Sequence, residues 1–130
     1  MRLTQETWEK LVQVLQGRRE IHFALLYGSA VEGQPFRDLD IGLVVDRTIV
    51  PASADWDYAF ALADELEDRV AYPVDVRVIN EAPLPFRYNV SCGKPLVIHD
   101  REAFYRFLER TWDEFLDFKP VALQYLQEVR

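Results

Sequence analysis

Two aspartates, two residues apart at the mouth of an apolar run, are the residues best suited to chemistry. Asp38 and Asp40 open the run that ends at Asp46. Residues at this spacing in a strand point their side chains to the same face. Adjacent carboxylates repel each other unless a cation lies between them. Hard oxygen ligands favour Mg²⁺, which is typically held by one or two carboxylates together with substrate phosphates. The pair therefore predicts a magnesium site for a phosphate-bearing substrate.

A glycine–serine pair precedes these acids in the chain. Gly28 and Ser29 follow the compact apolar run 21–27. A glycine lets the backbone approach a ligand closely, and the amides after it, with the serine hydroxyl, suit a phosphate if a helix begins there. Alone, the pair is equally typical of an ordinary strand-to-helix turn with a serine cap. The two aspartates that follow favour the phosphate-binding interpretation.

A third acid lies on a later strand. Asp75 stands between Val74 and Val76, and the alternation places its side chain on the face opposite the valines. If this strand pairs beside the one that carries Asp38 and Asp40, three carboxylates gather. Three acids can hold two Mg²⁺ ions, the arrangement suited to in-line attack on phosphorus. The alternative is an exposed residue that pairs with Arg77.

The elements that position these residues follow from hydrophobic periodicity. Strands are predicted over 21–27, 38–46 and 74–78, with a short fourth over 96–98. A first helix is predicted behind a Thr4 cap and ahead of Gly17. A second is predicted over 55–70, with an apolar stripe of Trp56, Ala59, Phe60, Ala63, Leu66 and Val70.

The last part of the chain is predicted to be helical. A loop is expected around Pro83 and Pro85, and a helix after Asp100 that Pro120 breaks or restarts. Its aromatic residues are more numerous than one sheet-covering face needs, so the surplus could form a partner-binding patch, with simple core packing as the alternative. They are Phe104, Tyr105, Phe107, Trp112, Phe115, Phe118 and Tyr125.

Composition bounds the class of protein. With 130 residues, 49% apolar and 28% charged, the chain fits one α/β or α+β domain spanning 1–130, with a helical C-terminal segment at about 101–130. The net charge of −7 disfavours DNA or RNA as a partner. One cysteine permits no internal disulfide, and the two histidines lack zinc-site spacing. No signal peptide or membrane span is visible, so we expect a cytoplasmic protein.

Together these residues resemble a known family. Gly28-Ser29, Gly33, Asp38-Leu39-Asp40 and the later Asp75 are similar to the pattern of minimal nucleotidyltransferase (MNT) domains of the polymerase-β-like nucleotidyltransferase superfamily. The resemblance covers about residues 20–80. It implies a mixed sheet of three to four strands flanked by helices.

The resemblance also implies an activity. Gly28 and Ser29 would bind the β- and γ-phosphates of ATP, and Asp38 and Asp40 would bind two Mg²⁺ ions. Asp75 would bind the catalytic one and help to deprotonate the attacking hydroxyl. Many such proteins are antitoxins that transfer AMP to a tyrosine of a HEPN-domain toxin, with which they assemble.

Two positions depart from the family pattern. Glu32 stands where many members have arginine, and Arg37 where many have serine or threonine. Glu32 removes a positive charge near the phosphates, which bears on catalysis more than on the fold. Two alternatives therefore stay open: a non-catalytic antitoxin that neutralises its partner by binding, and a nucleotidyltransferase for a small cationic molecule such as an aminoglycoside. Lys94 and Arg87 are further cations that could touch a triphosphate, although such side chains are more often solvated.

Overall fold

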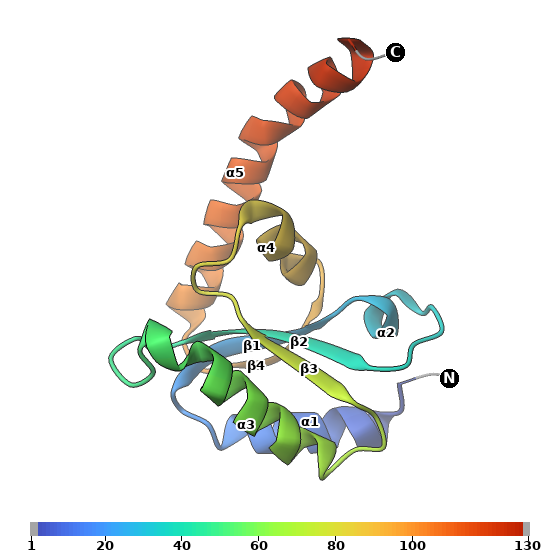
Figure 1. Cartoon of the computed structure of the whole chain (residues 1–130), viewed down its shortest axis with the longest axis vertical. Coiled ribbons are helices and arrows are strands. Elements are labelled where there is room, and N and C mark those ends of the chain that lie inside the picture. Colours follow the sequence, from blue (N-terminus) through green and yellow to red (C-terminus); the bar gives the residue numbers. More distant parts are fainter. Residues whose placement is uncertain (1–2, 129–130) are drawn as a thin grey trace.

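The computed structural model describes residues 3–128, with side chains described except at 119, 121–123 and 125–128. It contains four strands, β1 (Ile21–Tyr27), β2 (Leu39–Val45), β3 (Val74–Val78) and β4 (Lys94–Ile98). The helices are α1 (Gln5–Gln16), α2 (Ser29–Glu32), η1 (Ala52–Ala54), α3 (Asp55–Glu67), α4 (Leu84–Ser91) and α5 (Arg101–Glu128) (Figure 1).

The strands form one mixed sheet in the order β3-β2-β1-β4. β1 pairs antiparallel with both β2 and β4, whereas β2 and β3 are parallel. A parallel pair needs a crossover connection, which α3 supplies between β2 and β3. The predicted fold class, a mixed sheet flanked by helices, is confirmed.

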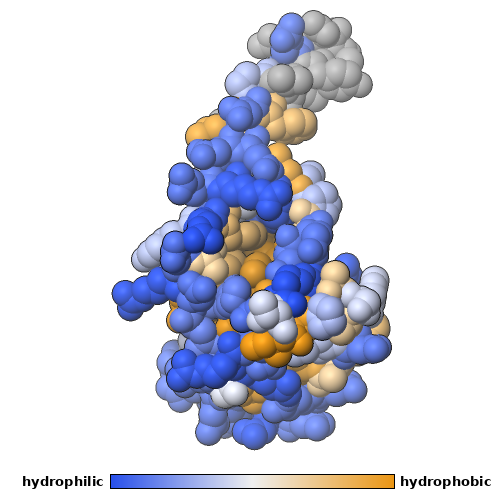
Figure 2. All heavy atoms as spheres, turned by 90° about the vertical axis from the view of Figure 1, so that its left-hand side faces the viewer, coloured by the Kyte–Doolittle hydropathy of each residue, from blue (hydrophilic) through white to orange (hydrophobic). Residues whose placement is uncertain are grey.

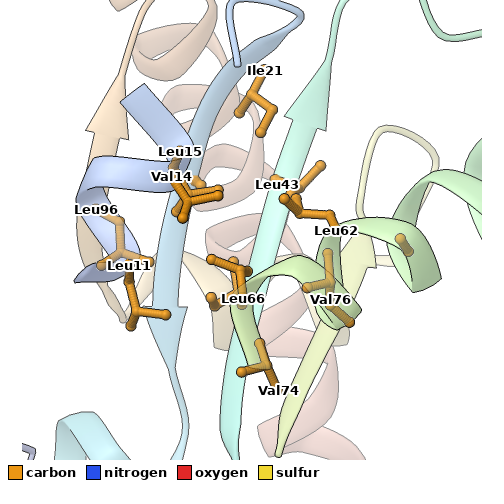
Figure 3. Close-up of a cluster of buried hydrophobic side chains, with 14 of the residues drawn as sticks. Leu11, Val14, Leu15, Ile21, Leu43, Leu62, Leu66, Val74, Val76 and Leu96 are labelled. Atoms are coloured by element: carbon orange, nitrogen blue, oxygen red, sulfur yellow. The ribbon is translucent and has the colours of Figure 1, made fainter. Parts of the chain in front are cut away.

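One face of the sheet is covered by α1 and α3 (Figure 1). Alternate residues of the central strands point into this layer, where they meet the apolar faces of the two helices. Its fully buried side chains include Leu11, Leu15, Leu26, Ile41, Leu43, Leu62 and Leu66 (Figure 3). As predicted, α1 begins after Thr4, whose hydroxyl accepts a hydrogen bond from the Thr7 amide, and ends at Gly17.

The other face carries a smaller core beneath α4 and the beginning of α5. Phe23 packs there against Phe104 with ring centroids 5.1 Å apart, and Val90 of α4 is fully buried. Gly42 makes this fit possible, because a Cβ at that position would lie 2.8 Å from Val90 Cγ1. The helix is thus seated directly on the backbone of β2.

Helix α4 replaces the loop predicted around Pro83 and Pro85. Pro83 caps the helix and Pro85 lies in its first turn. The first amides of a helix have no partner within it, so a proline there costs no hydrogen bond, and its fixed φ favours helix initiation. The two prolines start a helix in this sequence rather than prevent one.

The stripe predicted for the second helix is wrong in part. Trp56 and Phe60 are 71% and 62% exposed, whereas the buried residues of α3 are Ala59, Leu62, Ala63 and Leu66. The two aromatic residues lie one turn apart, with ring centroids separated by 5.9 Å. They leave a pair of large apolar rings at the surface.

Helix α5 is continuous and projects beyond the domain. It runs from Arg101 to Glu128 through Pro120, so the predicted break is wrong. Its first half is held to α4 by Arg87, which is buried, donates to Thr111 Oγ1 at 3.2 Å and pairs with Glu114. Phe115 stacks on Tyr88 at 4.0 Å.

Beyond that contact the helix extends away from the sheet, with apolar residues among its hydrophilic ones (Figures 1 and 2). Exposed side chains on α5 include Tyr105, Trp112, Leu116 and Phe118. Several predicted surplus aromatics are therefore on the surface, while the Tyr125 side chain lies outside those described. Within residues 3–128, no helix combines the length and apolarity needed to cross a bilayer.

Candidate active site

The sheet register brings two of the three predicted acids side by side. Asp40 is the direct partner of Asp75 across the parallel strands β2 and β3. Both lie on the face opposite the buried Ile41 and Val76 and are partly exposed. Asp38 lies just before β2, two residues from Asp40, and is exposed. All three acids therefore lie at one end of one sheet face.

The glycine–serine pair lies against the same acids. Tyr27, the last residue of β1, is the register partner of Asp40, so Gly28 follows directly. Gly28 has a φ of +81°, and a Cβ there would lie 2.8 Å from Asp40 Oδ2. Only glycine adopts this conformation easily and leaves that space. Ser29 then begins α2, the short helix that the sequence left open.

The neighbouring carboxylates at this end of the sheet raise the pKa values of the groups between them. Partial burial, followed by the charges of Asp38 and Asp75, raises the pKa of Asp40 from 3.8 to about 6. Burial and the charges of Asp40 and Asp75 raise the pKa of the Tyr27 hydroxyl to about 12. Arg77 opposes both shifts. A cation bound between the carboxylates would relieve the same repulsion.

The donor set fits Mg²⁺ in its chemistry, although the carboxylates do not converge on one point. In the described part of the chain, no three histidine, cysteine or acidic side chains form a ready-made metal site. Asp38, Asp40 and Asp75 supply only hard oxygen donors, which suit Mg²⁺ shared with substrate phosphates. An ion and a triphosphate would complete the coordination that the carboxylates begin.

Three residues beside the acids were not predicted as part of the site. Arg77 Nε lies 3.4 Å from Asp75 Oδ2, and its guanidinium lies 6.0 Å from the centroid of Phe86. Phe86 in turn meets Tyr27 edge to face at 5.8 Å. The signal for Arg77 was its spacing of two from Asp75 on a strand, which fixes a common face. Phe86 gave no signal, because α4 was not predicted.

The remaining sequence candidates lie in different surroundings. Arg87 is buried rather than solvated, because its guanidinium joins α4 to α5. Lys94 lines a hollow of about 500 Å³ beside α2 that none of the three aspartates lines. Glu32 and Arg37 are exposed on either side of Gly33. Among the described cations, Arg77 is the one that forms an ion pair with a candidate acid, Asp75.

A second hollow opens beside Asp75. It has a volume of about 420 Å³ and lies between α3 and β3, and we name it the β3 groove. Its lining includes Trp56, Phe60, Asp75, Val76, Arg77 and Val78. The groove thus joins the exposed aromatic pair of α3 to one of the candidate catalytic acids.

Comparison with known proteins identifies the family. Residues 9–102 match the family described as polymerase beta nucleotidyltransferase, which covers more than half of the chain. The chain belongs to this family. The match includes all four strands, α2 and every candidate site residue of this polymerase-β-type nucleotidyltransferase domain. No curated protein matches the chain in sequence.

Solved structures share the nucleotidyltransferase fold over nearly the whole chain. A structure of a toxin–antitoxin with AMP-PNP matches with a TM-score of 0.67 and 21% identity, covering 94% of this chain and 97% of the other. The toxin–antitoxin MntA-HepT gives 0.65 and 20%, covering 97% and 98%. A tri-AMPylated Shewanella oneidensis HEPN toxin in complex with MNT antitoxin gives 0.67 and 20%, covering 98% of each chain. At these identities the likeness establishes the fold.

Proposed function

We propose that this protein is a Mg²⁺-dependent nucleotidyltransferase that transfers AMP from ATP to a tyrosine hydroxyl of a HEPN-domain toxin, and thereby acts as its cytoplasmic antitoxin. The observation that carries the proposal is the pairing of Asp40 with Asp75, with Gly28 against the Asp40 carboxylate. This arrangement sets a phosphate-binding turn beside hard oxygen ligands. Membership in the nucleotidyltransferase family supports the same chemistry.

Each site residue then has a role. Gly28 and Ser29 bind the β- and γ-phosphates through the turn and the first amides of α2, which the helix itself leaves unpaired. Asp38 and Asp40 would hold two Mg²⁺ ions, and Asp75 would be a further ligand for the catalytic one. When bound, the ions neutralise charge on the phosphates and polarise the phosphorus.

The reaction is an in-line displacement at the α-phosphorus. The acceptor oxygen forms a bond to this phosphorus while the bond to the bridging oxygen of the β-phosphate breaks. Pyrophosphate leaves with that electron pair, and the hydroxyl proton passes to the carboxylate of Asp75. Asp75 suits this step because it is half-exposed and lies at the outer strand of the sheet, where an acceptor can reach it.

A protein acceptor is favoured over a small molecule or a nucleic acid. The fold neighbours are described as toxin–antitoxin complexes, one of them with a tri-AMPylated HEPN toxin and one with AMP-PNP. The net charge of −7 opposes binding of a nucleic-acid backbone. Exposed Trp112, Leu116 and Phe118 on the projecting α5 offer apolar surface to a protein partner.

Label transfer tests the proposal. Purified protein, Mg²⁺ and α-³²P-ATP are added to a lysate of the source organism, and the products are separated on a denaturing gel. A labelled protein band is expected with the wild-type protein and is absent with the Asp40→Asn variant. Asp64→Asn, an exposed acid on α3 away from the site, is the matched control and should label as wild type does.

The possible results separate the alternatives. If neither the wild-type protein nor any variant transfers label, but the partner is retained in a pull-down, the protein is an antitoxin that acts by binding and not an enzyme. Label found in a product of low molecular mass would show that the acceptor is a small molecule. Equal labelling by the wild-type and Asp40→Asn proteins would show that Asp40 does not hold a catalytic ion and would overturn the proposed site.

A further inference from the structure

The β3 groove lies on the side of the site from which an acceptor must approach. Across the sheet, the order runs from Gly28 after β1, through Asp40 on β2, to Asp75 on β3 and then to the groove. In-line displacement requires the leaving group and the nucleophile on opposite sides of the phosphorus. If the triphosphate lies at Gly28, the nucleophile enters from the β3 side.

The groove is bounded by an open strand edge. β3 is the outermost strand of the sheet and pairs with β2 alone. The Leu39 amide donates to Pro73 O, and the Ile79 amide donates to Leu43 O, so odd-numbered residues of this segment turn their backbone groups toward β2. Successive residues alternate, so the backbone groups of Val76 and Val78 point outward. Such an edge can accept a further strand.

Two aromatic rings line the groove without being needed by the core. Trp56 and Phe60 are 71% and 62% exposed although they belong to a well-packed helix. Their partners in the fold are chiefly each other, at 5.9 Å. Large exposed rings that flank a hollow are typical of a surface that receives an apolar side chain.

We propose that the β3 groove is the acceptor subsite, which binds an extended segment of the partner protein as an additional strand along β3. This assignment rests on the proposed function. Because residues alternate faces along a strand, the acceptor residue points to the face of Asp75, and its neighbour in sequence points to Trp56 and Phe60. The site therefore selects an acceptor hydroxyl flanked by an aromatic or aliphatic residue.

The first test separates acceptor binding from nucleotide binding. The double variant Trp56→Ala/Phe60→Ala is used in the label-transfer assay over a series of lysate concentrations, and its affinity for Mg·ATP is measured by calorimetry. We expect about a tenfold loss of protein labelling at low acceptor concentration, recovering at high concentration, which corresponds to about 1.4 kcal/mol of acceptor binding. The Kd for Mg·ATP should remain within about twofold.

The matched control is Tyr105→Ala on α5, since Tyr105 is 62% exposed, as Phe60 is, but lies outside the groove. This variant should leave both the protein labelling and the Kd for Mg·ATP unchanged. Val78→Pro is the second variant, because proline removes an outward amide and is tolerated on an edge strand. We expect it to reduce labelling of the acceptor in the same way, with the circular dichroism spectrum retained.

Each outcome decides the assignment. Equal labelling by wild type and the double variant would overturn it while leaving the proposed function intact. A parallel loss of Mg·ATP affinity would make the groove a nucleobase site, which also overturns it. If the wild-type protein labels nothing, the proposed function fails and the acceptor subsite fails with it.

Discussion

The two faces of the sheet are built from the same strands but are covered to different extents. On one face, α1 and α3 bury residues of all four strands in one apolar cluster. On the other, α4 and α5 cover only one end, where Val90 of α4 and Phe104 of α5 pack into the same cluster as Phe23 of β1. The uncovered end carries Asp40 and Asp75. Packing on the face covered by α1 and α3, the closed face, therefore fixes the strand register, and this register places the acids on the other, open face.

Asp40→Asn should have the largest effect on the rate of AMP transfer and should leave the fold intact. Transfer should fall on the order of a thousandfold, because an ion that stabilises the transition state by several kcal/mol would no longer be held. The fold should survive, since the substitution removes like-charge repulsion. Initial rates of label transfer and circular dichroism check both parts. Unfolding of the variant would mean that this end of the open face is structural.

Leu66→Ala, on the closed face, should lower the stability of the protein and leave its activity intact. Leu66 is a fully buried residue of α3 that faces the sheet. Its truncation should lower the free energy of unfolding by about 3 kcal/mol, measured by urea titration, without altering the transfer rate of the molecules that remain folded. Leu116→Ala, at a residue 59% exposed on α5, is the control and should change stability by less than about 0.5 kcal/mol. Equal losses would show that the Leu116 side chain also contributes to the packing of the domain.

Gly42→Ala tests how α4 is seated on the open face. The new Cβ would lie 2.8 Å from Val90 Cγ1 and 3.0 Å from Cγ2, so the helix must shift. We expect a loss of about 2 kcal/mol. In a double-mutant cycle, Val90→Ala should recover part of it, because it removes the clashing methyl groups. Additive losses would mean that the two positions do not meet.

The smallest expected effect is a pH dependence at the open end. The pKa of Asp40 is raised from 3.8 to about 6 by burial and by Asp38 and Asp75. Between these values the folded state binds more protons at Asp40 than the unfolded state does, so this residue's contribution to stability falls as pH rises. In metal-free buffer, the free energy of unfolding of Asp40→Asn should therefore rise relative to that of the wild-type protein as pH increases over this interval. Above the interval, the difference between the two proteins should stay constant.

Urea titrations of the two proteins at several pH values measure that difference. A constant difference across the interval would show that Asp40 titrates normally. Added Mg²⁺ at neutral pH should stabilise the wild-type protein and not the variant, because only the wild type offers both neighbouring carboxylates to the ion.

The sequence predicted the strands better than their arrangement. Alternation at Val74, Asp75 and Val76 was sufficient to place Asp75 on the face away from the core. That β3 runs parallel beside β2, with Asp75 opposite Asp40, depends on contacts between strands that local periodicity does not contain. The roles predicted for the acids and for Gly28-Ser29 remain predictions.

Helices were harder to predict where two signals compete. On α3 two adjacent apolar stripes exist, and the position of β3 decides that Leu62 is buried and Phe60 is not. Pro83 and Pro85 are typical of both a loop and a helix start, and only the packing of Val90 on Gly42 selects the helix. Arg77 and Phe86 could not be assigned to the site before α4 was known.

The outer edge of β3 has a consequence for the protein when it is alone. The open outer edge of β3, beside Trp56 and Phe60, is also a geometry through which the sheets of two copies can join and aggregate. Arg77, exposed on this strand, places a charge at the edge that would face another copy and oppose such growth. If an acceptor segment pairs with this edge as proposed, it would also protect the protein from self-association.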